Sequence, residues 1–169
     1  IPNNSARDLV RTKSDAIGLV VRGVSNPFYT DIIRAIESTI TQAGFTMVMR
    51  QIASCDDEIK CGAVMEREKR LRGIIFLGGQ FDYTAADLAL LNVPFVCCSY
   101  SNRYGTLTEG EYSSVSIADE ETAREAVREL YRHGHRRIAA LISRPDDQSI
   151  SQLRYEGYVS ALEELGLEF

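Results

Sequence analysis

The stretch at positions 16–21 contains five apolar residues and one glycine, with no polar residue between them. A short run of this kind is typical of a strand that is buried on both faces of a parallel sheet. The turn sequence RGVSNP follows, and then Phe28 and Tyr29. Strand-to-helix corners form the binding rim of open α/β sheets, so we expect both aromatic residues to lie near a ligand crevice.

A helix is predicted directly after this corner. Ser25 or Asn26 is suited to cap it, and Pro27 fits its first turn. Isoleucines then recur at helical spacing and predict one apolar face that packs back on the sheet; they occupy positions 32, 33, 36 and 40.

The same succession of apolar runs and amphipathic segments continues to the end of the chain. It predicts strands near 45–51, 73–78, 94–99, 114–117 and 137–142, with helices near 56–71, 84–91, 119–133 and 150–165. Strictly alternating elements predict an α/β fold with a doubly wound parallel sheet. The unit that begins near Asp119 holds only one strand and two helices, so we expect a second lobe that is incomplete in this chain, as in a fragment.

Composition narrows the classes of function. The chain has 169 residues, 44% of them hydrophobic, which is enough for a core in one domain or two small lobes. A net charge of -5 argues against the whole chain wrapping nucleic acid. The first fourteen residues carry three basic residues and one acid, or +2, which leaves -7 for the rest. This basic arm hints at DNA contact, although a solvated tail explains the same charges.

No apolar run approaches the roughly 18 residues that a membrane span needs, and no leader sequence is recognisable. We therefore expect a soluble, cytoplasmic protein without a membrane partner. Cys97 and Cys98 are neighbours in a predicted strand and point to opposite faces, while the spacing of Cys55 and Cys61 matches no zinc pattern. The sequence predicts free thiols, no bound metal and no cofactor.

The motifs of the common enzyme classes are missing. Neither G-x-G-x-x-G nor G-x-x-x-x-G-K-[ST] nor G-x-S-x-G occurs. The two histidines, His133 and His135, flank Gly134 at a predicted helix end, where turn or capping roles are expected. Acidic pairs begin helices or lie in a loop, where they suit the helix dipole or solvent. We predict no catalytic residue and no enzyme activity.

The first residues carry one further pattern. Ala6 and Leu9 lie three apart on one face of a possible two-turn helix, with Arg7 and Arg11 beside them. A leucine that separates a base step while arginines hold phosphates is what minor-groove insertion needs. A helix this short is marginal alone in water, so a frayed terminus is the alternative.

Four segments together resemble the lactose repressor and galactose repressor family of bacterial transcription regulators. Residues 1–21 resemble its hinge helix and first core strand, and SNPFY resembles its Asn-Pro-Phe-aromatic corner. HGHRRIAALI resembles its Gly-His-Arg-Arg-Ile strand entry, and RYEGYVSALEELGL its Arg-x-x-Gly-Tyr-x-x-Ala-Leu helix. The segments occur in the family's order across essentially the whole chain.

The resemblance implies a periplasmic-binding-protein-like module of two lobes that holds a small effector, most often a sugar, between them. It implies a hinge at 1–14, an N-terminal lobe at 15–118 and the start of a C-terminal lobe at 119–169, with a helix-turn-helix head absent here. The implied partners are operator DNA and a second copy of the protein in a homodimer.

The resemblance also implies site residues. Arg154 matches the arginine that grips effector oxygens, although an ion pair with Glu156 or Glu163 is the alternative. Where many members place Asp-Arg after the fourth strand, this chain has Ser99-Tyr100, which removes a bidentate acceptor for sugar hydroxyls. The implied effector-binding residues are Asn26, Phe28, Tyr29, Gly78, Gly79, Gln80, Ser99, Gln148 and Arg154, and the implied DNA-contacting residues are Ala6, Arg7 and Leu9.

Two other functions fit an α/β sheet of this size. A periplasmic sugar-binding protein that feeds a transporter shares the two-lobed architecture, but the arm with Ala6, Arg7 and Leu9 has no role there. A nucleoside- or sugar-processing hydrolase shares the sheet, but the sequence offers no identifiable base, nucleophile or metal set.

Overall fold

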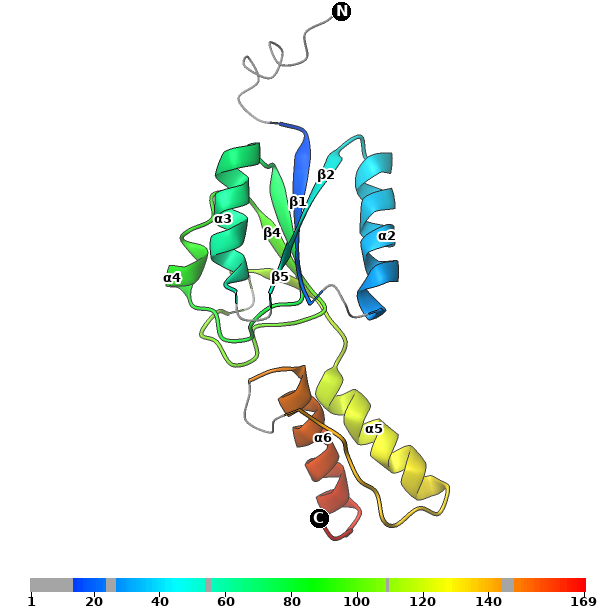
Figure 1. The fold of residues 1–169 in the computed structure, drawn as a ribbon. Coiled ribbons are helices and arrows are strands. Elements are labelled where there is room, and N and C mark those ends of the chain that lie inside the picture. Colours follow the sequence, from blue (N-terminus) through cyan, green and yellow to red (C-terminus); the bar gives the residue numbers. More distant parts are fainter. Residues whose placement is uncertain (1–13, 24–26, 54–55, 109, 144–147) are drawn as a thin grey trace, which may run out of the picture.

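The computed structural model describes residues 14–23, 27–53, 56–108, 110–143 and 148–169. These residues form two parts that follow one another along the chain (Figure 1). The first part is a sheet with helices on both faces, and the second is a pair of helices beyond the edge at which the strands end. Residues 1–13 of the predicted hinge lie outside the described residues, as do Ser25 and Asn26. The prediction that Ser25 or Asn26 caps the first helix is wrong, because that helix begins at Phe28 and its N-cap is Pro27.

Within the part of the chain that the structure describes, the sheet has five strands, and every pair of neighbours is parallel, as the sequence predicts. Its spatial order is β2-β1-β3-β4-β5. All carboxyl ends of the strands therefore meet at one edge. The strands are β1 (Ala16–Arg22), β2 (Thr46–Ile52), β3 (Gly73–Leu77), β4 (Phe95–Cys98) and β5 (Ser113–Val115).

Helices cover both faces of the sheet. Helix α2 (Phe28–Gln42) lies on one face, and α3 (Glu58–Lys69) with the short α4 (Ala85–Leu88) lies on the other (Figure 1). This arrangement explains why β1 lacks polar alternation. Leu19 and Val21 pack in the cluster beneath α2, while Val20 packs in the cluster that contains Ile59 and Met65 of α3.

Cysteines of the fourth strand follow the same period of two. Cys97 belongs to the core cluster on the α3 face, and Cys98 packs against the cluster on the α2 face. The prediction that these thiols point to opposite faces is confirmed. Both are free cysteines, as is Cys61.

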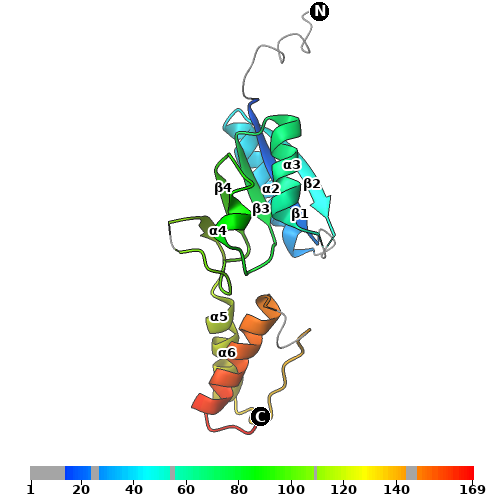
Figure 2. The ribbon, with the colours of Figure 1, turned by 90° about the vertical axis from the view of Figure 1, so that its left-hand side faces the viewer.

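The second part consists of α5 (Asp119–Arg132) and α6 (Ile150–Glu164), which lie side by side in both views (Figures 1 and 2). Val127, Ala161 and Leu162 form a small buried cluster between them. The close approach depends on Gly157, because a Cβ there would lie 2.0 Å from the carbonyl oxygen of Glu120.

The predicted strand at 137–142 is wrong, because this segment has no strand in the structure. A strand needs a neighbouring strand for its backbone groups, and all five strands of the sheet belong to the first part. Side chains of α6 meet backbone groups here instead. The Tyr158 hydroxyl donates to the Ile138 carbonyl at 2.9 Å, and the Ser143 amide donates to the Ser151 hydroxyl at 2.9 Å.

Other boundaries differ by one to three residues. Strand β5 ends at Val115, two residues before the predicted end, so Ile117 lies in the connection to α5 and is 57% exposed. Helix α3 ends before Leu71, because Arg70 adopts a left-handed conformation with φ 52°. Gly134, at a predicted helix end, follows α5 with φ 90°, and Gly44 follows α2 with φ 80°.

Candidate functional site

A hollow of about 830 Å³ lies between the carboxyl edge of the sheet and the second part of the chain. This volume is within the range of small-molecule sites. Both parts line it: the first part contributes Phe28, Tyr29 and Ser99, and the second contributes Asp119, Arg154 and Tyr158. Apolar residues of α5, from Ala123 to Leu130, make one wall. A ligand here would touch both parts at once.

The aromatic corner presents one ring to this hollow and keeps the other in the core. Helix α2 begins at Phe28, immediately after the turn that follows β1. Tyr29 is 9% exposed and packs with Leu19 and Val21, whereas Phe28 is 56% exposed. Their ring centres lie 5.7 Å apart with the planes tilted by 54°. Phe28 is therefore the ring that can lie against a ligand face.

Glycines at the end of β3 allow the neighbouring side chains to approach. Gly78 has φ 72°, and a Cβ there would lie 2.7 Å from the Tyr29 hydroxyl. A Cβ at Gly79 would lie 2.4 Å from Glu58 Oε1 and 2.4 Å from Tyr100 Cζ. These contacts leave no room for a side chain. The two glycines therefore shape the rim by packing, which is a role that the sequence does not reveal.

Glu58 stands behind this rim and is fully buried. Its carboxylate accepts hydrogen bonds from the Arg22 guanidinium and from the Gln80 amide, the latter at 2.6 Å. Arg22 also donates to the carbonyl of Asp56, and the Gln80 amide lies 3.1 Å from the Tyr83 hydroxyl. These bonds tie together the ends of β1 and β3 and the start of α3.

A second hollow of about 460 Å³ opens beside this network. Residues at the ends of β1 and β3 line one side, and the residues just before α6 line the other. Gln148, with φ 50°, donates from its amide to Gln152 Oε1 at 2.8 Å, which fixes this approach to α6. The lining residues are Arg22, Gly79, Gln80, Phe81, Asp82, Gln148 and Ser149.

Ser99 and Tyr100, which stand where the family resemblance leads us to expect Asp-Arg, have different surroundings. Ser99 has φ 71°, donates from its amide to Val115 at 2.8 Å and lines the larger hollow. Tyr100 is 1% exposed and packs against the rings of Phe81 and Tyr83. Burial raises the pKa of Tyr100 well above its usual value and that of the Cys97 thiol to about 11. Neither residue supplies the missing carboxylate.

Arg154 pairs with Asp119, not with Glu156 or Glu163. Its Nε donates to Asp119 Oδ1 at 2.8 Å, and the Asp119 side chain is 5% exposed while that of Arg154 is 56% exposed. The bond joins the first residue of α5 to the second turn of α6. Sequence reasoning assigned Asp119 only to a helix start, because its partner lies 35 residues further on.

The predicted site residues thus fall into two groups. Phe28, Tyr29, Ser99 and Arg154 share the larger hollow, and Gly79, Gln80 and Gln148 share the smaller one. The hollows adjoin at the start of α6, where Ser149 lines one and Ile150 the other. Gly78 lies at the same strand end but lines neither. Asn26, Ala6, Arg7 and Leu9 lie outside the described residues.

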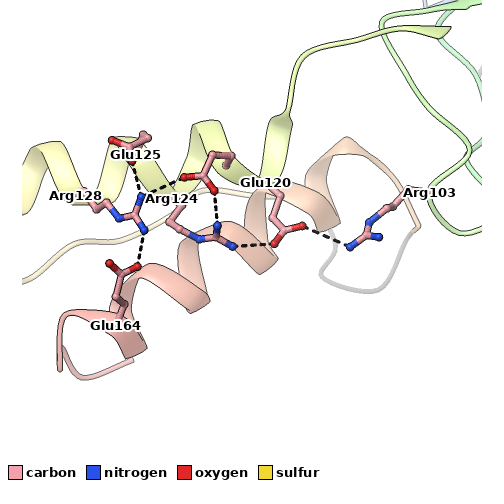
Figure 3. A network of polar contacts seen from close by, with 7 residues as sticks. Arg103, Glu120, Arg124, Glu125, Arg128 and Glu164 are labelled. Atoms are coloured by element: carbon pink, nitrogen blue, oxygen red, sulfur yellow. Dashed lines mark hydrogen bonds and ion pairs between the residues drawn. The ribbon is translucent and has the colours of Figure 1, made fainter.

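Contacts between the two parts fix the start of α6 against the sheet. Leu153 packs into the core cluster of the first part, and Tyr104 donates to Glu156 at 3.4 Å. Arg103 reaches Glu120 at 3.6 Å (Figure 3). Glu120 also pairs with Arg124 at 2.9 Å, so this contact continues into the ion-pair network of α5 and α6 (Figure 3).

No group of three His, Cys, Asp or Glu side chains within the described residues is arranged to hold a metal ion. None of the helices described is both long enough and apolar enough to cross a membrane.

A family model described as periplasmic binding proteins and sugar binding domain of LacI family matches residues 14–169. The chain is 36% identical over 172 residues to the HTH-type transcriptional regulator MalR of Clostridium butyricum, an alignment that covers 99% of this chain and 50% of MalR. The chain spans about half the length of the curated relatives that it matches.

Solved structures give the same fold. A periplasmic binding protein/LacI transcriptional regulator from Alkaliphilus metalliredigens QYMF, complexed with D-xylulofuranose, superposes with a TM-score of 0.73 and 25% identity, over 92% of this chain and 55% of that one. The lac repressor dimer bound to operator and the anti-inducer ONPF superposes with a TM-score of 0.72 and 22% identity, over 99% of this chain and 57% of that one. The two-part arrangement seen here is therefore shared.

Proposed function

Since the chain belongs to the family of periplasmic binding proteins and LacI-type sugar-binding domains, we propose that it is the effector-sensing core of a bacterial transcriptional regulator. The core binds a small molecule, most simply a sugar, between its two parts. Binding changes how tightly the regulator holds operator DNA, and the regulator acts as a repressor.

The observation that carries this proposal is the hollow shared by Phe28 and Arg154. An exposed aromatic ring and a guanidinium that line the same hollow suit a sugar, whose carbon face is apolar and whose hydroxyl oxygens accept hydrogen bonds. Because the two residues belong to different parts of the chain, a ligand that binds both favours one relative placement of those parts. Differential contacts of this kind allow a ligand to shift a conformational equilibrium.

The proposed site contains the nine residues that the resemblance implies. Phe28 packs on the ligand, Arg154 and the side-chain amides of Gln80 and Gln148 donate to its oxygens, and Ser99 lines the wall. Gly78 and Gly79 keep the rim narrow. Tyr29 supports Phe28 from the core, and Asn26 belongs to the same corner.

We propose the domain organisation that the sequence indicates. Residues 1–14 serve as a hinge that contacts DNA through Ala6, Arg7 and Leu9, residues 15–118 form the N-terminal lobe, and residues 119–169 begin the C-terminal lobe. Pairing of two copies would bring two hinges to one operator, as symmetric operators require. The lac repressor, to which the chain is similar, is a dimer on its operator.

We further propose that the chain has no catalytic function. The relatives that it matches are transcriptional regulators and not enzymes. The same relatives favour a regulator over a transport-associated sugar-binding protein. A regulator also gives the basic residues of positions 1–14 a function, which is to contact DNA.

Measuring operator binding with and without sugars tests this proposal. A thermal-shift screen of the full-length protein first identifies a ligand, because a ligand that binds only the native state raises the melting point. Fluorescence anisotropy then follows a labelled operator as this ligand is added. We expect an operator affinity that changes at least about fivefold, the lower end of typical allosteric coupling. A bound sugar that leaves operator affinity unchanged, or that is converted to product, would contradict the proposal.

A further inference from the structure

Each of the two hollows contains one arginine, and each arginine is paired with a carboxylate that is almost or fully buried. Arg22 in the smaller hollow bonds to Glu58, which has no exposed surface. Arg154 in the larger hollow bonds to Asp119, whose side chain is 5% exposed. In both hollows, the positive charge of the arginine is thus balanced by a neighbouring carboxylate.

Among the residues that the structure describes, those that line the smaller hollow carry no excess positive charge. Arg22 contributes one positive charge and Glu58, directly behind it, one negative charge. Asp82 also lines this hollow and is exposed, so it adds a second negative charge. The remaining lining residues, among them Gln80, Gln148 and Ser149, are neutral.

We infer that Glu58 is a positioning residue that sets the charge selectivity of the cleft, which binds neutral, hydroxyl-rich ligands and discriminates against their phosphorylated forms. This inference rests on the proposed function. A phosphate group carries a charge between about -1.5 and -2 near pH 7 and needs an excess of positive charge to replace its water. A neutral sugar needs only N–H donors, which an arginine keeps when a carboxylate balances it.

A role in stability alone explains the buried pair of Arg22 and Glu58 less well than a role in ligand selectivity. Removing two charges from water costs free energy, and apolar side chains of the same volume stabilise a core as well or better. The pair also lies at the rim of a hollow, where Glu58 orders both Arg22 at the end of β1 and the backbone amide of Gln80 in the connection after β3. Glu58 therefore affects the charge and the orientation of groups that a ligand in the smaller hollow would contact.

The test compares matched sugars in the full-length regulator. Calorimetry measures the affinities for fructose and fructose 1-phosphate, glucose and glucose 6-phosphate, and cellobiose and cellobiose 6-phosphate. In every pair that binds, we expect the wild-type protein to hold the neutral sugar at least about tenfold more tightly, which is the effect of one unfavourable charge nearby.

Glu58→Gln keeps the size of the side chain and an acceptor for the Gln80 amide but removes the charge that balances Arg22. We expect the ratio of neutral to phosphorylated affinity to fall at least about tenfold. The double variant Arg22→Gln/Glu58→Gln removes both charges and should return the ratio toward the wild-type value. Glu37→Gln makes the same change of charge on the exposed surface of α2 and should leave the ratio unchanged.

A second variant covers the case in which Glu58→Gln does not fold. Asp119→Asn removes the charge that balances Arg154 and should shift the ratio in the same direction. An unchanged ratio in a folded variant, or a wild-type protein that prefers the phosphorylated sugar while sugars still alter operator affinity, would overturn the inference and leave the proposed function standing. Binding of no member of any pair, with operator binding intact, would instead remove the proposed sugar effector and the inference with it.

Discussion

Arg154 has two roles at the scale of a single residue, because it lines the larger hollow and also holds Asp119. Its Nε is engaged by Asp119, and it makes no other hydrogen bond to the residues that the structure describes. No described residue occupies the rest of the planar guanidinium, which can bind ligand oxygens in a fork.

Replacing Arg154 by alanine should weaken effector binding by roughly 1.5–3 kcal/mol, the usual loss for a hydrogen bond that involves a charged group. Calorimetry on the full-length protein measures this loss. Because the change also leaves Asp119 almost buried and unpaired, the melting point of the ligand-free protein is recorded in parallel. Arg34→Ala, which removes an exposed ion pair on α2, serves as the control and should change neither value. Equal effector affinity in Arg154→Ala and wild type would exclude Arg154 from the site.

The sequence predicted those site residues that depend on a local pattern, and it missed the pairs that join distant positions. Phe28 and Tyr29 could be placed from sequence because a strand, a turn and a helix start lie within about fifteen residues. The pairs Arg22–Glu58 and Arg154–Asp119 could not, since they join residues 36 and 35 positions apart and each acid also suits a helix start. Tyr100 shows the same limit: its position after β4 suggests the rim, but packing against Phe81 buries it.

At the scale of elements, Gly157 decides how closely α5 and α6 approach. A Cβ at this position would lie 2.0 Å from the Glu120 carbonyl oxygen and 2.9 Å from its carbonyl carbon. These are backbone atoms, so no rotation of a side chain can relieve the overlap. The two helices would have to separate and uncover the cluster of Val127, Ala161 and Leu162.

Gly157→Ala should therefore destabilise the protein by about 1–3 kcal/mol, as overpacking generally does. The sign of the change in unfolding free energy is informative, because alanine in place of glycine stabilises an exposed helix by up to about 1 kcal/mol. Urea unfolding measures the change, with Glu163→Ala on the exposed face of α6 as a control that should lie within about 0.5 kcal/mol of wild type. A stabilised Gly157→Ala would show that α5 and α6 are further apart than described.

The pattern of apolar residues predicted a helix or strand correctly where the segment packs against the neighbours that such an element needs. β1 and β3 lie within two residues of their predicted bounds, because both are short apolar runs that are buried on both faces. The segment 137–142 is equally apolar, yet it is not a strand. Its backbone groups meet side chains of α6, and Leu141 is fully exposed. The sequence pattern thus identified an apolar segment correctly. Whether such a segment becomes a strand also depends on a neighbouring strand to pair with, and the pattern of one segment does not show whether that partner exists.

At the scale of the whole molecule, two separately packed parts are joined at the start of α6. Leu153 lies in the core of the first part while Ala161, two turns later, lies in the cluster with α5. The residues that precede α6 line the smaller hollow, and its first two turns line the larger one. A ligand in either hollow therefore acts on the element that links both parts.

Hydrogen–deuterium exchange of the full-length protein, with and without a saturating sugar, tests most directly whether one ligand engages both parts. We expect slower exchange in two peptides together, one covering residues 27–33 at the start of α2 and one covering residues 148–156 at the start of α6. Residues 36–42 of α2, which line neither hollow, provide the internal control and should exchange at the same rate in both states. Protection of only one of the two peptides, or protection that lies elsewhere, would contradict a ligand site shared by Phe28 and Arg154.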